Sequence, residues 1–231
     1  MSANLPRSTL PLTSRRTVLA GLGLAAASVT FAEWPVFAER KDGPAEVPVD
    51  ELMKSGAGDL PDLVLGPADA KVTVVEYASM TCGHCAAFAT KVFPELKTKY
   101  IDSGKIRFVM REFPLDNLAA AVSMLTRCAG GDKTIPLIET FYQTQSDWAF
   151  KQGNPVPRLF EIAKQAGFTQ ATFDECLKDQ KLYEAILAMR ERGSKDYKVE
   201  STPTLFINGK VQKGGASIEE LDKLIQPFLK S

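Results

Sequence analysis

Two cysteines separated by two residues, Cys82 and Cys85, are the residues of this 231-residue chain whose spacing best suits thiol redox chemistry. They follow an apolar run, Val72–Ala78, that predicts a buried strand, and they precede a run over residues 86–100 that predicts a helix. At the start of a helix, unpaired backbone N–H groups and the helix dipole stabilise a thiolate. A Cys-X-X-Cys motif at such a junction lowers a thiol pKa by several units, so the spacing predicts a redox-active pair.

Two further residues could tune this pair. His84 lies between the cysteines and is the only histidine of the chain, and a cationic imidazole would stabilise a neighbouring thiolate. Glu76 interrupts the apolar strand shortly before Cys82. A carboxyl group in a buried strand must be neutral or paired, so we interpret Glu76 as part of the site. The alternative is that Glu76 faces solvent at the end of the strand.

The same motif is compatible with other kinds of site. Structural zinc normally takes four ligands, but the remaining cysteines, Cys128 and Cys176, stand far apart and the chain has no second histidine. A purely structural disulfide between Cys82 and Cys85 would close a tiny loop and add little stability. A metal-binding module that holds Cu(I) through these two cysteines and His84 stays open as an alternative of another class. Redox chemistry fits the motif best, and we expect no metal and no cofactor in the site.

The composition favours one globular domain, or one domain with an insertion. Hydrophobic residues make up 45% of the chain and charged residues 24%, and the formal net charge is zero. This balance predicts no basic surface of the kind that nucleic-acid-binding proteins use, so we expect no nucleic-acid partner. Beyond the N-terminal leader, no apolar run reaches the length of a membrane span.

Residues 1–38 have the three parts of a secretory signal peptide. The pair Arg15 and Arg16 precedes an apolar stretch of small residues, and Ala38 ends a cleavage site. The arginine pair resembles a twin-arginine export signal, but Val18 stands where that pattern usually has Phe, so general secretion is an alternative. An uncleaved amphipathic helix is the other interpretation. We therefore expect an exported bacterial protein in the periplasm, where cysteines meet an oxidising environment.

The rest of the sequence predicts strands on both sides of a helical block. An extension over residues 39–61 contains one short predicted helix. A strand–helix–strand unit around the cysteines predicts a right-handed parallel crossover, and Asn208-Gly209 predicts an antiparallel hairpin. The predicted strands span residues 63–66, 72–78, 106–111, 204–207 and 210–213. The predicted helices span 49–54, 86–100 with a kink at Pro94, 118–129, 135–145, 156–166, 171–178, 182–197 and 217–229.

Together these motifs resemble the thioredoxin superfamily and, within it, the DsbA-like thiol:disulfide oxidoreductases. The matching stretches are residues 74–79 with the motif from Cys82 to Cys85, and residues 201–209, which begin Ser-Thr-Pro. The resemblance implies an α/β thioredoxin-like fold, a central mixed sheet flanked by helices, with an inserted all-helical subdomain. It divides the chain into a first thioredoxin-like part at residues 62–115, a helical insertion at residues 116–198 and a second thioredoxin-like part at residues 199–231.

The resemblance also implies a role for each residue of the first motif. Cys82 would be the exposed nucleophile that forms mixed disulfides, and Cys85 would be the buried resolving thiol. His84 would stabilise the Cys82 thiolate and so make the disulfide oxidising. Glu76 would match the buried acid of the family, which assists proton transfer at Cys85.

A second motif would complete the site. Pro203 matches the family's cis-proline beside the active site, and the backbone of Thr202 would pair with substrate as an added strand. An ordinary proline at the start of a strand is the alternative. Gly83-His84 and Thr202 match the residues that protein disulfide isomerases have at these positions better than those of strong oxidases. Whether the protein works as an oxidase or as an isomerase or reductase therefore stays open.

The implied function is the introduction of disulfide bonds into exported proteins by dithiol–disulfide exchange at Cys82 and Cys85. The substrates would be unfolded or reduced exported proteins, and a membrane protein resembling DsbB would reoxidise the cysteines. A disulfide isomerase or reductase, kept reduced by a DsbD-like donor, is the alternative. Isomerases of the DsbC/DsbG type carry a separate N-terminal dimerisation domain, for which the short extension leaves no room, so we expect a monomer.

The remaining cysteines, Cys128 and Cys176, both lie in the predicted helical block. Two such cysteines are expected to pair in an oxidising compartment, so we interpret them as a structural disulfide. A second redox-active or regulatory pair is the alternative, although neither cysteine has a partner at Cys-X-X-Cys spacing.

Overall fold

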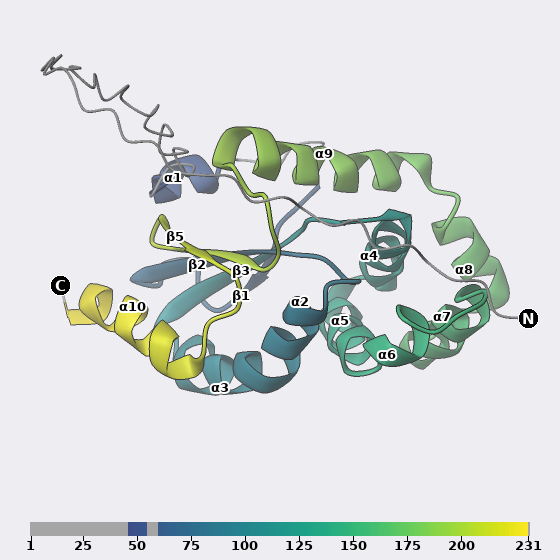
Figure 1. The fold of residues 1–231 in the computed structure, drawn as a ribbon, viewed down its shortest axis with the longest axis horizontal. Coiled ribbons are helices and arrows are strands. Elements are labelled where there is room, and N and C mark those ends of the chain that lie inside the picture. Colours follow the sequence, from purple (N-terminus) through teal and green to yellow (C-terminus); the bar gives the residue numbers. More distant parts are fainter. Residues whose placement is uncertain (1–45, 55–59, 231) are drawn as a thin grey trace, which may run out of the picture. The chain divides into compact units, whose positions relative to one another are not determined.

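The structure, a computed structural model, describes residues 46–54 and 60–230. The predicted signal peptide, residues 1–38, lies outside the described residues, as does part of the predicted extension over residues 39–61. The described residues belong to one unit, in which helices lie on both faces of a single sheet (Figure 1).

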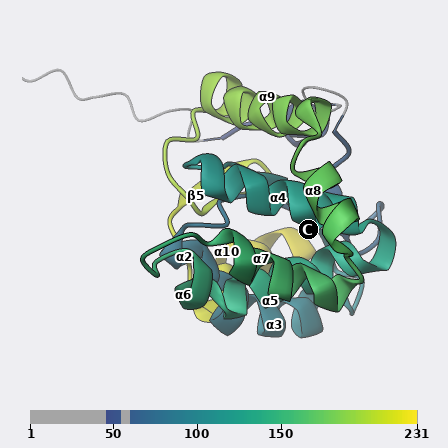
Figure 2. The same ribbon diagram turned by 90° about the vertical axis from the view of Figure 1, so that its right-hand side faces the viewer.

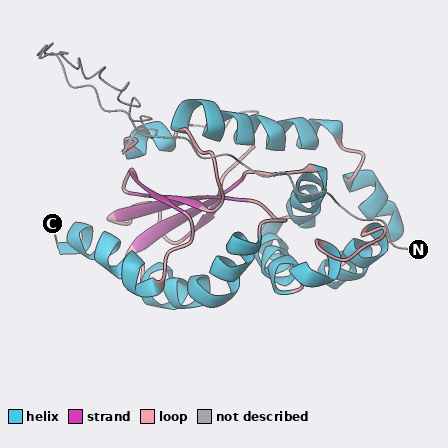
Figure 3. Cartoon of the chain, viewed as in Figure 1, coloured by secondary structure: helices cyan, strands magenta, loops and turns pink. Residues whose placement is uncertain are grey.

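Five strands form a mixed sheet in the order β1-β3-β2-β4-β5 (Figure 3). β2 and β3 are parallel, as a strand–helix–strand unit requires, and the other three pairs are antiparallel. The hairpin between β4 and β5 turns at Asn208 and Gly209, whose φ angles of 45° and 91° suit a two-residue turn. The predicted fold class is confirmed. The strands are β1 Leu63–Leu65, β2 Val72–Ala78, β3 Ile106–Glu112, β4 Thr204–Ile207 and β5 Lys210–Lys213.

The helical run after Cys82 is not one regular helix. α2 spans Gly83–Ala87 and α3 spans Phe93–Leu96, and a wide π-helical turn follows each of them, η2 at Phe88–Val92 and η3 at Lys97–Ile101. Pro94 has no N–H to donate, and a proline ring crowds the carbonyl group four residues before it. A widened turn directly before this proline relieves that crowding, and the irregularity falls where the sequence predicts a kink.

The segment between β3 and β4 is helical, as the sequence predicts, and Figure 2 shows its first helix, α4, between α9 on one side and α5 and α7 on the other. The predicted helix over residues 135–145 is two helices, because the chain leaves helical geometry at Thr144 and Trp148 Nε1 donates back to the carbonyl of Phe141 at 2.9 Å. None of the described helices is long and apolar enough to cross a membrane. The other helices are α1 Val49–Leu52, α4 Asn117–Ala129, α5 Thr134–Gln143, α6 Gln145–Trp148, α7 Val156–Ala163, α8 Gln170–Cys176, α9 Gln180–Tyr197 and α10 Ile218–Lys230, with 3₁₀ turns at Gly131–Lys133 and Lys164–Ala166.

The two faces of the sheet bury different residues. Val74 and Phe108 belong to the larger core, which α2, α3 and α10 cover, whereas Val75 and Phe206 belong to the smaller core under α1 and α9 (Figure 1). Successive side chains of a strand point to opposite faces, so Glu76 lies on the same face as Val74. The carboxyl group of Glu76 therefore lies on the face of the sheet that is covered by the helix that follows Cys82.

Candidate active site

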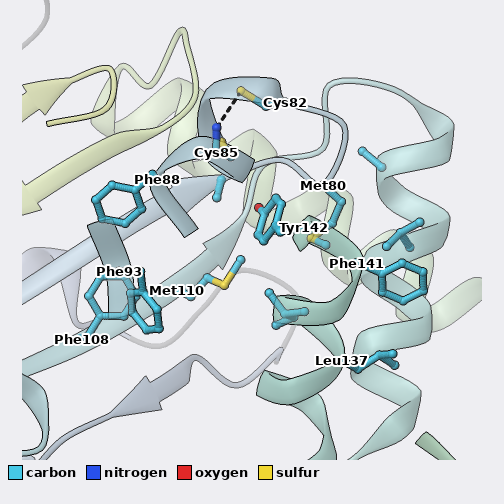
Figure 4. Packing of buried hydrophobic residues seen from close by; sticks show 14 of the residues in the cluster. Met80, Cys82, Cys85, Phe88, Phe93, Phe108, Met110, Leu137, Phe141 and Tyr142 are labelled. Atoms are coloured by element: carbon cyan, nitrogen blue, oxygen red, sulfur yellow. Dashed lines mark hydrogen bonds between the residues drawn. The ribbon is translucent and has the colours of Figure 1, made fainter. Parts of the chain in front are cut away.

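Cys82 is the N-cap residue of α2 and stands where that helix begins. Its backbone is extended, and its Sγ accepts a hydrogen bond from the backbone N–H of Cys85, with an N–S distance of 3.4 Å (Figure 4). The thiol of Cys82 donates to the carbonyl oxygen of Thr202 at 3.3 Å. The sulfur thus lies between the start of α2 and the segment before β4, two parts of the chain that are 120 residues apart.

Hydrogen bonds lower the pKa of the Cys82 thiol to about 5. The hydrogen bond from the Cys85 thiol has the largest effect, Thr202 and the backbone N–H groups of Cys85 and His84 add to it, and burial opposes them. The Thr202 hydroxyl is buried without a hydrogen-bond partner in the described structure, so it can donate to Cys82 once the thiol ionises. At neutral pH Cys82 is therefore a thiolate, the reactive form in disulfide exchange.

Cys85 is more deeply buried than Cys82, and its pKa is shifted in the opposite direction. Its exposed fraction is 0%, against 9% for Cys82, and both residues are free thiols. Burial, the hydrogen bond to Cys82 and the charge of Glu76 together raise the pKa of Cys85 far above that of an ordinary thiol. One motif thus holds a sulfur that is ionised at neutral pH and a more deeply buried sulfur that stays protonated. Cys82 is itself buried, and not exposed as the resemblance implied.

The carboxyl group of Glu76 is buried, with 5% of the residue exposed, so the alternative that it faces solvent is wrong. Burial, and then the charge of Cys82, raise the pKa of Glu76 to about 8, and the group is neutral at pH 7. Glu76 and Tyr142 line a cavity of about 30 Å³, enough for about one water molecule. Figure 4 shows Tyr142 reaching from α5 towards Cys85.

His84 lies exposed in the first turn of α2. It contributes to the low pKa of Cys82 through a hydrogen bond from its backbone N–H, a group that every residue except proline possesses. The role predicted for its imidazole stays a prediction.

The Thr202–Pro203 peptide bond is cis, as the resemblance implies. The antiparallel pairing of β4 with β2 sets Thr204 opposite Tyr77, close to the end of β2 from which the chain runs to Cys82. This pairing explains why a segment so distant in the sequence meets the first cysteine. Both residues of the cis bond are buried there.

The helical insertion makes polar contacts with this site that the sequence analysis did not predict. Gln145 Nε2 donates to the carbonyl oxygens of Met80 at 2.7 Å and of Cys82 at 3.1 Å. The hydroxyl of Tyr142 donates to the carbonyl oxygen of Ser79 at 3.3 Å. Neither residue belongs to a motif, so no signal in a single sequence distinguishes them from other polar residues on a helix.

Cys128, in the last turn of α4, and Cys176, the last residue of α8, form a disulfide between positions 48 residues apart. An open hollow of about 1050 Å³ borders this disulfide and is lined largely by charged and small side chains. Its size alone does not make it a site, because its lining presents no convergent set of buried polar groups. Within residues 46–54 and 60–230, no group of three or more His, Cys, Asp or Glu side chains could hold a metal ion.

The sequence profile of the thioredoxin family matches residues 59–227. The chain belongs to this family. A protein of Rickettsia bellii named for protein-disulfide oxidoreductase activity is 37% identical over 164 residues, which make up 71% of this chain and 63% of that protein. Disulfide bond formation protein D of Bacillus subtilis is 30% identical over 174 residues, 72% of this chain and 77% of that protein.

Solved structures agree with this assignment. The crystal structure of alpha-DsbA1 from Wolbachia pipientis matches with a TM-score of 0.69 and 27% identity, over 74% of this chain and 92% of that one. The chain is thus a DsbA-like member of the thioredoxin superfamily. It spans about three fifths of the length of the Rickettsia relative, 63%.

Proposed function

We propose that this DsbA-like protein is a thiol:disulfide oxidase that introduces disulfide bonds into exported proteins. The observation that carries the proposal is the opposite shift of the two thiols, a pKa of about 5 at Cys82 and a strongly raised pKa at Cys85. A stabilised Cys82 thiolate favours the dithiol form, and a protein whose dithiol form is favoured is a strong oxidant when its cysteines are paired.

The reaction begins with the Cys82–Cys85 disulfide. A substrate thiolate attacks Cys82 Sγ, the bond between the two cysteines breaks, and Cys85 leaves as a thiolate that takes up a proton. The second substrate thiol, once deprotonated, attacks the substrate sulfur of the mixed disulfide and releases the Cys82 thiolate. Two substrate thiols are oxidised to one disulfide, and the two electrons are held by the cysteines of the enzyme.

Glu76 supplies the proton that Cys85 needs. Its carboxyl group is neutral at pH 7, and it lines a cavity beside Tyr142 that has room for about one water molecule. The charge of Glu76 is among the causes that raise the pKa of Cys85, which supports a proton transfer between the two groups. His84 assists by stabilising the Cys82 thiolate.

The substrate binds as an extended strand beside the cis-proline loop. The carbonyl oxygen of Thr202 lies 3.3 Å from Cys82 Sγ, and a substrate backbone N–H can replace the thiol as its donor. Pro203 has no N–H and shapes this edge of the site. Main-chain pairing of this kind accepts many sequences, as an enzyme acting on unfolded proteins requires.

The cellular setting completes the proposal. The protein is exported to the periplasm with its signal peptide cleaved near Ala38, acts as a monomer, and is reoxidised by a DsbB-like membrane partner. The leader sequence supports the export, and the name of the Bacillus relative, disulfide bond formation protein D, supports the direction of the reaction.

Oxidative refolding of a reduced protein substrate tests the proposal. Wild-type protein oxidised in advance should restore the activity of the substrate, Cys82→Ser should abolish this turnover, and Cys85→Ala should accumulate mixed disulfides at Cys82. Turnover by Cys82→Ser at the wild-type rate would refute the mechanism.

Gly83-His84 and Thr202 favour a second candidate, a disulfide isomerase or reductase kept reduced by a DsbD-like donor. Such a protein would rearrange the disulfides of scrambled ribonuclease faster than it oxidises reduced ribonuclease. The ratio of the two rates, measured with the same preparation, separates the candidates.

A further inference from the structure

A buried amide from the helical insertion binds the loop that precedes α2. Gln145 is the first residue of α6, and its exposed fraction is 5%. Its Nε2 donates to the carbonyl oxygen of Met80 at 2.7 Å and to that of Cys82 at 3.1 Å. An amide nitrogen carries two hydrogens, so both donors of this group are used on the same short turn.

The position of Gln145 is itself fixed by packing. At the other end of α6, Trp148 is 1% exposed, its Nε1 donates to the carbonyl of Phe141, and the two rings meet edge to face at 5.7 Å. One turn before α6, Tyr142 donates to the carbonyl of Ser79. The corner between α5 and α6 therefore contacts the active-site loop through two buried donors on a rigid frame.

The two acceptors of Gln145 bear directly on the position of the Cys82 sulfur. The Cys82 carbonyl also accepts the first helical hydrogen bond, from Ala86 N at 3.1 Å. Fixing this carbonyl fixes the peptide plane that follows Cys82, and with it the direction in which the side chain leaves the N-cap. That direction decides whether Sγ meets the backbone N–H of Cys85 on one side and Thr202 on the other.

We propose that Gln145 is a positioning residue of the redox site, whose amide holds the Met80–Cys82 turn so that Cys82 Sγ stays against the N–H groups of α2. Gln145 touches no reacting atom and acts through the loop. The inference rests on the proposed function and deepens it, because it makes the helical insertion part of the device that stabilises the thiolate.

Two variants of nearly equal size test the role of the amide. Gln145→Met removes both donors without opening a cavity, and Gln145→Glu replaces them with a group that, once ionised, can only accept hydrogen bonds and repels the Cys82 thiolate. The matched controls are Gln143→Met and Gln143→Glu, because Gln143 is the same residue type two positions away and is exposed.

The readout is the pH titration of thiolate ultraviolet absorbance in the reduced, folded protein. We expect Gln145→Met to raise the Cys82 pKa by about one unit, a tenfold loss of thiolate at low pH, with a larger rise in Gln145→Glu. The potential of the Cys82–Cys85 pair should become more reducing in both variants. Both Gln143 variants should titrate as the wild type does.

A purely structural role would give a different result. If the Gln145→Met protein is folded and less stable but its Cys82 titrates as in the wild type, the inference is overturned. Gln145→Leu, which also lacks both donors and adds no charge, gives the same decision should Gln145→Met fail to fold, whereas a rise in Gln145→Glu alone would reflect the added charge and would overturn the inference. The titration needs no substrate and no reoxidant, so its outcome is separate from that of the refolding assay for the proposed function.

Discussion

The two cysteine pairs of this chain occupy opposite ends of helices. Cys82 stands at the N-terminus of α2, where backbone N–H groups point at its sulfur. Cys128 and Cys176 lie in the last turns of α4 and α8, where helices present carbonyl groups, and Cys176 Sγ lies 3.3 Å from the carbonyl oxygen of Met124. The helix dipole favours a thiolate at the first position and disfavours one at the second.

Cysteine thus serves two purposes in this chain, disulfide exchange and stabilisation of the fold. The disulfide of the Cys-X-X-Cys pair closes too small a loop to constrain the unfolded chain. The surroundings of its two sulfurs instead lower the pKa of Cys82 and raise that of Cys85, which favours thiol–disulfide exchange. The Cys128–Cys176 pair closes a long loop, 48 residues, and ties α4 to α8 inside the helical insertion. We therefore propose exchange chemistry for the first pair and stabilisation for the second.

Variants that remove each pair in turn should show the largest difference between the two pairs. Cys82→Ser should lose all oxidase activity with little change in stability. Cys128→Ala/Cys176→Ala should keep its activity but lose ~4 kcal/mol of unfolding free energy, the chain-entropy value for a loop of this length. Urea unfolding and oxidative refolding of both proteins measure the two effects. Lost exchange activity in a folded double-alanine variant would show that the second pair is redox-active.

Glu76 should give the next largest effect, on the pH dependence of stability. Its pKa of about 8 in the folded protein lies above the ordinary 4.5, so the folded state binds the proton more tightly than the unfolded state. The unfolding free energy must therefore fall as the pH rises between these values. In the disulfide form Cys82 carries no charge, and burial, the larger of the two causes, still raises the pKa of Glu76. Glu76→Gln should therefore remove the decline seen in that form and be more stable than the wild type at alkaline pH.

Urea unfolding of both proteins across this pH range measures the difference. Parallel curves for Glu76→Gln and the wild type would mean that the carboxyl group is ionised without penalty, and the proposed proton donor would lose its physical basis.

His84 should give the smallest effect. His84→Leu keeps the backbone N–H that bonds to Cys82 and removes only the exposed imidazole, so we expect a slight rise in the Cys82 pKa. Thiolate titration of the reduced variant measures it. A rise as large as that expected for Gln145→Met would show that imidazole charge, rather than the position of the loop, controls the first cysteine.

The sequence predicted the parts of this site that depend on local pattern. Apolar continuity identified β2, the spacing of Cys82 and Cys85 identified the start of α2, and the burial of that strand made Glu76 a buried acid. The motif that contains Pro203 indicated the distant loop through resemblance to a family. Each of these signals lies within a few consecutive residues.

The parts that escaped prediction depend on tertiary contact. Nothing near Gln145 or Thr144 in the sequence indicates that α5 ends there and that an amide then reaches the carbonyl of Cys82. The stabilising role of the His84 imidazole stays a prediction, because its side chain is exposed and the spacing of the motif does not give its direction.

The most direct test of the account is the reduction potential of the Cys82–Cys85 pair, measured by equilibration with glutathione buffers. A Cys128→Ala/Cys176→Ala background keeps the second pair out of the signal. With Cys82 held as a stabilised thiolate, we predict a strongly oxidising value near that of DsbA, about −120 mV. A value near that of thioredoxin, about −270 mV, would contradict the oxidase and identify a protein that is kept reduced.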